Sequence, residues 1–268
     1  MKKAQRPYIY LFFTVFLSLI LLFAAYCSDK NDDALNPAEV RKQNTFRTIR
    51  GIEFVLVKAG TFTMGSPESE EGRNAEFETQ REVRIENDFW ISRYEITQAQ
   101  FDEVAARRYR FHFPNPQNPA EMVNWHEAVN FAAAIGARLP SAAEWEYAAR
   151  GGQHKRGNGR LFSGGDNLHD LGWYARNSSS GTRVGGQRAF NELGIFDMSG
   201  NVWEWCSDEN NPWFATIPGT YRVIRGGAYN SFAYECRIAH IWRMDANDRK
   251  PDVGFRVVFD INYEEDKK

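Results

Sequence analysis

The chain has 268 residues, of which 43% are hydrophobic and 15% aromatic, and its formal net charge is −2. This apolar content is enough for a substantial buried core and excludes an intrinsically disordered chain. The small net charge, with no basic stripe beside the aromatic residues, excludes a typical nucleic-acid-binding protein.

The N-terminus has the pattern of an export signal. Lys2, Lys3 and Arg6 precede an apolar run over residues 8–26, and a positive flank before such a run is typical of exported proteins. We therefore expect a protein of the bacterial cell envelope. Its folded part would lie on the exported side of the inner membrane, in the periplasm or at the outer membrane.

Cys27, directly after this run, resembles the lipidated cysteine of bacterial lipoproteins. It follows the small residues Ala24 and Ala25 and precedes a polar, charged stretch, although Tyr26 takes the place of the usual small residue. The alternative is an uncleaved anchor, because the apolar run is long enough to span a bilayer. Either alternative predicts membrane attachment, through a lipid on Cys27 or through the N-terminal run.

Composition divides the chain into four segments. Residues 1–27 form the export signal, and residues 28–46 are polar, contain Pro37 and are typical of a tether. Residues 47–260 are expected to form one folded domain, and the charged residues 261–268 a loose tail.

Short strands and short helices are predicted within the domain. Alternation and composition place the strands at residues 52–57, 59–65, twice within 82–96, 221–229 and 253–259. Thr97 can cap a helix over residues 98–107, and a second helix is expected over residues 126–135. Ser141 and Glu144 form the capping box of a third helix.

Residues 193–208 concentrate acids and tryptophans around two glycines. Asp197 and Glu204 are hard oxygen donors of the kind that calcium prefers. Trp203 and Trp205 alternate about Glu204, so an extended backbone places both indoles on one face and the acid on the other. The alternative is a tryptophan-rich core loop with capping acids.

Eight motifs, taken in order, resemble the sulfatase-modifying-factor family, whose founding members are formylglycine-generating enzymes. They are residues 62–65 (FTMG), 94–97 (YEIT), 123–125 (VNW), 138–140 (RLP), 144–152 (EWEYAARGG), 194–205 (GIFDMSGNVWEW), 225–227 (RGG) and 254–256 (GFR). The resemblance implies a single compact α+β domain with little regular secondary structure, related to the C-type lectin fold.

The resemblance also implies one calcium site in the tryptophan-rich segment. Its ligands would be the side chains of Asp197 and Glu204 and the backbone of Gly200 and Val202. The family's other calcium site needs an asparagine where this chain has Leu171, so that second site is not expected.

The chain departs from the family at the copper centre. Formylglycine-generating enzymes use oxygen and a copper ion held by two cysteine thiolates to oxidise a cysteine of a client sulfatase. Counted from Gly227, the two thiolate positions are Ser231 and Cys236, and the active-site serine is replaced by Ala228. A serine hydroxyl is a poor ligand for Cu(I). Copper is therefore not expected, and the chain is more similar to a non-generating branch of the family.

Two of the three cysteines remain if Cys27 carries lipid. Cys206 and Cys236 can form a disulfide in an exported domain, or they can be buried free thiols. No Cys-x-x-Cys motif and no cysteine–histidine cluster is present, so a zinc site is not expected.

Two functions remain open at this point. The preferred hypothesis is an envelope lipoprotein whose domain is a non-catalytic binding or scaffold module for a protein or glycan partner, because Ser231 replaces a copper cysteine. The alternative is a divergent formylglycine-generating oxidase acting on exported sulfatases, in which Cys236 remains as a catalytic residue.

Overall fold

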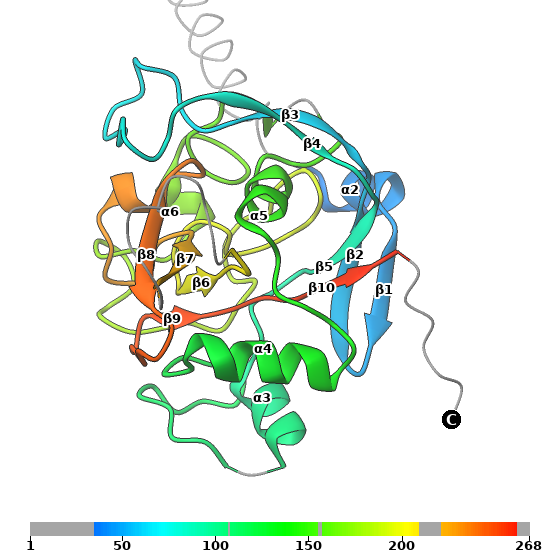
Figure 1. The fold of residues 1–268 in the computed structure, drawn as a ribbon, viewed down its shortest axis with the longest axis vertical. Coiled ribbons are helices and arrows are strands. Elements are labelled where there is room, and N and C mark those ends of the chain that lie inside the picture. Colours follow the sequence, from blue (N-terminus) through cyan, green and yellow to red (C-terminus); the bar gives the residue numbers. More distant parts are fainter. Residues whose placement is uncertain (1–34, 107, 155–156, 209–220, 262–268) are drawn as a thin grey trace, which may run out of the picture. The chain divides into compact units, whose positions relative to one another are not determined.

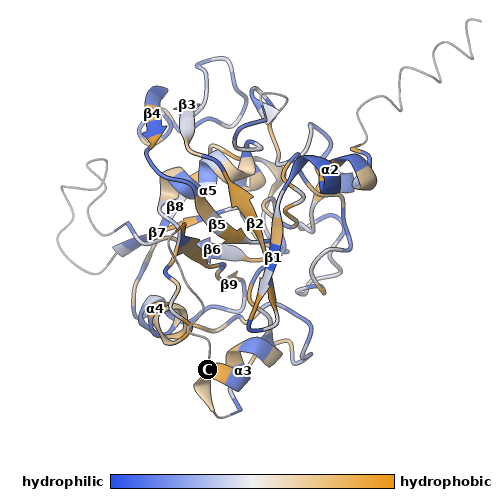
Figure 2. Ribbon diagram, turned by 90° about the vertical axis from the view of Figure 1, so that its right-hand side faces the viewer, coloured by the Kyte–Doolittle hydropathy of each residue, from blue (hydrophilic) through white to orange (hydrophobic). Residues whose placement is uncertain are grey.

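Strand β2 (Ile52–Val57) lies inside a four-stranded antiparallel sheet in the computed structural model of the protein (Figure 1). The strand order is β1 (Phe46–Ile49), β2, β5 (Phe89–Ser92) and β10 (Val258–Asp260). Five of the six residues of β2 and all four of β5 are buried, which agrees with their apolar composition. Figure 2 shows both strands in the colour of hydrophobic residues.

A second four-stranded sheet carries the tryptophan-rich segment. Its order is β8 (Ile241–Asp245), β7 (Tyr221–Arg225), β6 (Trp203–Trp205) and β9 (Val253–Gly254). The pair β6 and β9 is parallel, and the other pairs are antiparallel. Residues 255–257 then connect this sheet to β10 of the first one, so the end of the chain joins the two sheets.

A separate two-stranded ribbon consists of β3 (Gly60–Met64) and β4 (Arg81–Ile85). The long connection between these strands, residues 65–80, leaves the ribbon at one end (Figure 1). We call residues 66–79 of this connection the acidic loop, because it contains five acids and one arginine.

Two of the three predicted helices begin directly after the predicted caps Thr97 and Ser141, and the second begins at Trp125, one residue before the predicted start. The three helices are α3 (Gln98–Ala105), α4 (Trp125–Ala134) and α5 (Ala142–Ala149), and each has a complete capping box, with Thr97, Asn124 and Ser141 as the respective N-caps. The shorter helical elements are α2 (Pro37–Gln43), α6 (Leu168–Leu171) and the 3₁₀ helix η3 (Ala233–Cys236).

The structure describes residues 35–106, 108–154, 157–208 and 221–261. Pro37–Lys268 form one compact unit, and Met1–Asn36 are grouped separately. The predicted export signal, Cys27 and most of the charged tail therefore lie outside the described residues. Within the described ranges no helix is long and apolar enough to cross a membrane.

The folded unit begins ten residues before the predicted boundary at residue 47. The side chain of Val40 in α2 is buried, and Asn44 donates a hydrogen bond to the backbone oxygen of Glu192 at 3.0 Å. Polar composition had suggested a tether over this stretch, but one buried apolar residue and one long-range amide contact place it in the domain.

Candidate functional site

Glu204, the central residue of β6, is completely buried and fully hydrogen-bonded. Its Oε1 accepts from Nη2 of Arg256 at 2.8 Å, and its Oε2 accepts from Nε of the same guanidinium at 2.7 Å. The indole nitrogen of Trp145 donates a third bond to Oε2 at 2.6 Å. The carboxylate therefore joins α5, β6 and the segment between the two sheets.

Two further buried acids lie near Glu204. Asp197 has a left-handed backbone (φ 57°), and its Oδ2 accepts from the backbone N–H of Gly186 at 2.7 Å. Its Oδ1 has no hydrogen-bond partner among the described residues. Burial raises the pKa of Asp197 to about 6, and the neighbouring Glu204 adds to this rise.

Glu95 is the third acid of this group, and sequence reasoning did not single it out as a site residue. It accepts from Nδ2 of Asn201 at 2.5 Å and from the backbone N–H of Val202 at 3.2 Å. Burial, followed by the charges of Asp197 and Glu204, raises the pKa of Glu95 well above its ordinary value. A cavity of about 230 Å³ has Glu95 in its lining.

This acid cluster (Glu95, Asp197 and Glu204) fits the expected calcium ion in part. Three buried carboxyl groups face one buried guanidinium, that of Arg256, and one oxygen of Asp197 is unsatisfied. A divalent cation would balance this excess of acid. However, both oxygens of Glu204 are already engaged. In addition, no group of three or more His, Cys, Asp or Glu side chains among the described residues has the arrangement of a metal site.

Ser231 and Cys236, at the two copper positions, lie around one backbone amide. Oγ of Ser231 accepts from the N–H of Ala228 at 3.1 Å, and the N–H of Ser231 donates to the oxygen of Ala228 at 3.0 Å. The same amide interacts with the thiol of Cys236. Ser231 is therefore used to close the turn that follows the glycine pair.

Cys236 ends η3 and is completely buried among apolar side chains, those of Phe162, Leu168, Leu171 and Tyr174. A Cβ on Gly227, which has φ 73°, would lie 2.7 Å from its Sγ. Burial, and then the charge of Glu235, raises the pKa of the Cys236 thiol. Burial therefore disfavours the thiolate, which is the form that binds metals and acts as a nucleophile.

Cys206 and Cys236 are free thiols in the structure, so the predicted disulfide is not formed. Cys206 is buried in a different hydrophobic cluster from Cys236. The structure therefore agrees with the other alternative, in which both cysteines are buried free thiols. The sequence could not separate the two alternatives, because both require only that the cysteines be buried.

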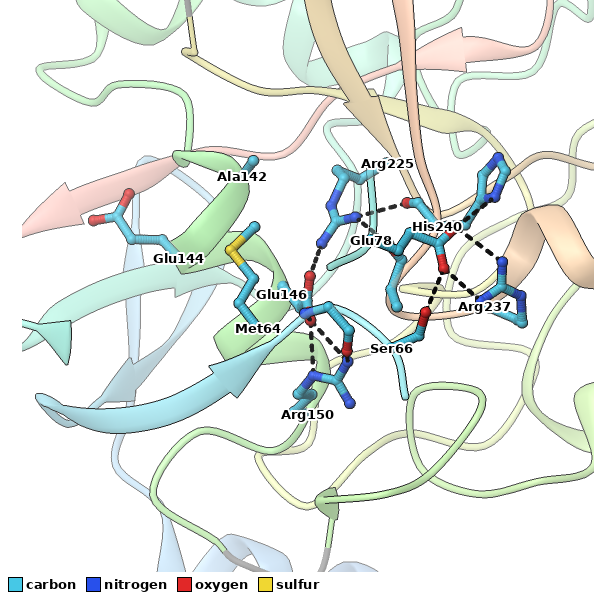
Figure 3. Close-up of polar contacts among 12 residues, drawn as sticks. Met64, Ser66, Glu78, Ala142, Glu144, Glu146, Arg150, Arg225, Arg237 and His240 are labelled. Carbon is cyan, nitrogen blue, oxygen red and sulfur yellow. Dashed lines mark hydrogen bonds and ion pairs between the residues drawn. The ribbon is translucent and has the colours of Figure 1, made fainter. Parts of the chain in front are cut away.

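A second buried charge network joins Glu146, Arg150 and Arg225 (Figure 3). Arg225, which precedes the glycine pair, forms an ion pair with Glu146 and donates to the backbone oxygens of Ala239 and His240 at 3.0 and 2.7 Å. The other oxygen of Glu146 accepts from Arg150 at 2.7 Å. The network fixes both ends of the segment that carries Ser231 and Cys236.

Arg237 ties the acidic loop to the same segment. Its guanidinium binds Glu78 through two hydrogen bonds of 2.8 and 2.9 Å (Figure 3). It also binds Glu70 at 2.5 Å. Oε2 of Glu78 also accepts from the hydroxyl of Ser66 at 2.7 Å. Burial raises the pKa of Glu78, but hydrogen bonds from His240, Arg237 and Ser66 outweigh this and lower it to about 2.

Comparison with known proteins identifies the family. Residues 38–261 match the model of the sulfatase-modifying factor enzyme 1-like domain. The chaperone protein LppX of Paenibacillus barcinonensis is 30% identical over 263 residues, which cover 77% of this chain and 89% of that protein. The formylglycine-generating enzyme of Streptomyces coelicolor is 34% identical over 174 residues, covering 55% of this chain and 54% of the enzyme.

Solved structures support the same conclusion. PvdO from Pseudomonas aeruginosa has a TM-score of 0.67 and 26% identity, covering 81% of this chain and 98% of that one. Treponema denticola variable protein 1 has a TM-score of 0.69, and the match covers 81% of this chain and 99% of that protein's chain. Because the sequence identity is 22%, this similarity concerns the fold alone. The predicted fold class, a single α+β domain of the formylglycine-generating-enzyme type, is confirmed. The chain belongs to the family of sulfatase-modifying factor enzyme 1-like proteins.

Proposed function

We propose that this protein is a membrane-anchored protein of the cell envelope whose domain binds other proteins and has no copper oxidase chemistry. The main support for this proposal is that neither of the two copper positions, Ser231 and Cys236, offers an exposed thiolate. One position holds a hydroxyl that closes a turn, and the other holds a completely buried thiol whose pKa is raised by burial. A substrate cysteine would have no exposed thiolate pair to approach.

The relatives support a binding role. LppX, which matches this chain over most of both lengths, is named a chaperone protein. The formylglycine-generating enzyme is matched over about half of its own length. A chaperone of exported proteins needs no redox centre, but it needs a stable binding surface. The buried ion pairs of Glu146 and Glu78 would provide that stability.

Membrane attachment and calcium belong to the same proposal. Cys27 would carry the lipid anchor, and its place after the apolar run supports this. Calcium would have a structural role at the acid cluster, with Asp197 as its main side-chain ligand, because the free Oδ1 of that residue supports a bound cation.

Copper binding tests the absence of oxidase chemistry. We would titrate Cu(I) into the reduced full chain in detergent and compare Cys236→Ala with Cys206→Ala, which removes the other buried thiol. We expect no one-to-one site in the wild type. Tight one-to-one binding of Cu(I) that disappears in Cys236→Ala and persists in Cys206→Ala would overturn the proposal. It would instead support the oxidase alternative.

Binding to unfolded protein tests the positive part of the proposal. Reduced hen lysozyme aggregates, and its light scattering can be followed with increasing amounts of the full chain. We expect scattering to be suppressed near a one-to-one ratio. If scattering stays unchanged at a fivefold excess of the chain, the chaperone-type role is wrong.

A further inference from the structure

Exposed aromatic side chains gather beside the buried Cys236. In the part of the chain that the structure describes, five large hydrophobic side chains are exposed. Three of them are neighbours here: Phe232 is 66% exposed, Trp242 52% and Tyr234 47%. His240 lies beneath them and is 6% exposed. We call these four residues the aromatic surface.

The rings of the aromatic surface are regularly spaced. The centroids of Phe232 and Tyr234 are 6.0 Å apart, and their planes are nearly parallel. Tyr234 is 6.1 Å from His240, which stacks on Trp242 at 6.5 Å. Alternate side chains of an extended polypeptide are also about 6.5 Å apart. An extended segment laid across the surface can therefore place side chains on the exposed rings of Phe232, Tyr234 and Trp242, while the buried ring of His240 lies between Tyr234 and Trp242.

Two local contacts support the backbone of the aromatic surface. Glu235 accepts a hydrogen bond from the backbone N–H of Phe232 at 2.7 Å. The acidic loop packs against Tyr234, because a Cβ on Gly72 would lie 2.7 Å from the Cβ of that tyrosine. The backbone positions of Phe232 and Tyr234 are thus defined in the free protein, which reduces the entropic cost of binding.

The charge next to the aromatic surface is negative. The acidic loop contains five acids and one arginine, and two of the acids, Glu70 and Glu78, are bound by Arg237. Glu68 and Glu71 are exposed, and Glu71 adjoins the glycine that contacts Tyr234. Exposed rings beside exposed acids favour cationic side chains, because ring faces and carboxylates both attract them.

Arg243, the cation that follows Trp242, lies against Phe77 of the acidic loop, but the exposed acids of that loop, Glu68, Glu71 and Glu76, outnumber it. Its guanidinium lies over the rings of Tyr221 and Phe77 at 5.7 and 6.0 Å. Successive side chains of a strand point to opposite faces. Arg243 is therefore on the face of β8 opposite to Trp242.

We infer that the aromatic surface and the acidic loop bind extended, basic segments of partner proteins. The inference rests on the proposed protein-binding function and adds where such a partner binds and which chemistry it carries. Apolar and long basic side chains of the segment pack on the rings of Phe232, Tyr234 and Trp242. Its arginines and lysines pair with Glu68 and Glu71.

Binding of defined peptides tests this inference. The probe is a fluorescein-labelled nonapeptide with arginine and leucine at alternate positions, and the matched peptide has glutamate in place of arginine. Anisotropy is measured with the full chain in detergent. We expect the basic peptide to bind and the acidic peptide to bind at least about tenfold more weakly, since the surface is negatively charged.

Three variants locate the binding site. Trp242→Ala is expected to weaken binding of the basic peptide by about tenfold or more, as for an aromatic anchor. The double variant Glu68→Gln with Glu71→Gln is expected to weaken it severalfold and to reduce its dependence on salt. Ile261→Ala removes another exposed apolar side chain and serves as the control that leaves binding unchanged.

The outcomes separate this inference from the proposed function. Equal affinity of Trp242→Ala and wild type, equal binding of both peptides, or displacement of the basic peptide by chitohexaose would overturn the inference. Suppression of lysozyme aggregation that persists in Trp242→Ala would also overturn it, while the protein-binding function would stand. If wild type neither binds the basic peptide nor suppresses aggregation, both are wrong.

Discussion

Arg237 and Glu78 form a bidentate ion pair inside the protein, with N–O distances of 2.8 and 2.9 Å. The two residues are 159 positions apart in the sequence, and their side chains are 2% and 0% exposed. This pair connects the acidic loop to η3. It therefore holds together the two parts of the surface that we propose as the binding site.

Removing the cation of this pair should destabilise the fold strongly. Arg237→Met leaves Glu78 buried without its main partner, and we expect unfolding to require about 3–5 kcal/mol less free energy. Chemical denaturation at pH 7 measures the change. Arg84→Met is the control, because Arg84 forms an exposed pair with Glu86 and such pairs contribute about 0–1 kcal/mol. An equal effect of both substitutions would contradict the structural role of Arg237.

The same pair predicts how stability falls in acid. The pKa of Glu78 in the folded protein is about 2, against an ordinary value of 4.5. A lowered pKa contributes stability above pH 4.5, and this contribution is lost as the pH falls towards 2. It corresponds to about 3 kcal/mol. We expect the free energy of unfolding of Glu78→Gln to change less between pH 6 and pH 3 than that of wild type. Parallel curves would show that Glu78 does not titrate in this way.

Local signals in the sequence were sufficient for most elements of the fold. Thr97 and Ser141 marked the starts of α3 and α5, because a capping box needs only residues three positions apart. Alternating and apolar runs marked β2 and β3. These features depend on neighbouring residues, and the sequence contains them directly.

Long-range pairings could not be predicted in the same way. The parallel pairing of β6 with β9 and the contact of Arg237 with the acidic loop join residues about 50 and 160 positions apart. The acid cluster was predicted in part, since Asp197 and Glu204 lie in one motif. Glu95 was missed because it comes from a distant loop, and only the folded chain brings it to Asn201 and Val202.

The buried carboxyl group of Glu121 predicts a loss of stability as the pH rises from acid to neutral. Its side chain is completely buried; Oε1 accepts from the N–H of Phe113 at 2.8 Å, and Oε2 has no partner among the described residues. Burial raises its pKa from 4.5 to about 7. A raised pKa gives full stability below pH 4.5, and stability falls progressively as the pH rises from there through 7.

Glu121→Gln should remove this dependence. The amide stays neutral, so we expect the variant to lose about 3 kcal/mol less than wild type between pH 5 and pH 9. Urea denaturation at several pH values measures the difference. Glu76→Gln, at an exposed position of the acidic loop, is the matched control. If wild type and Glu121→Gln lose the same stability over this range, Glu121 is ionised throughout.

Calcium should raise the melting temperature through Asp197. A ligand that binds only the folded state stabilises it by RT ln(1 + [L]/Kd), which is about 2.7 kcal/mol at a hundredfold excess over Kd. We expect 1 mM calcium to raise the melting temperature of wild type but not of Asp197→Asn. Magnesium at the same concentration controls for ionic strength. A melting temperature unaffected by calcium, with chelator-treated protein as the start, would mean that this cluster holds no calcium.

Cys27 should determine how the protein stays at the membrane. We expect wild type expressed in a bacterial host to incorporate radiolabelled palmitate and to partition into the detergent phase. Cys27→Ser should lose the label, because the thiol is the acceptor of the lipid. Cys206→Ala keeps Cys27 and should be labelled like wild type. An unlabelled wild type that is membrane-bound and retains its N-terminal residues would instead favour the uncleaved anchor, since the apolar run of residues 8–26 can span a bilayer.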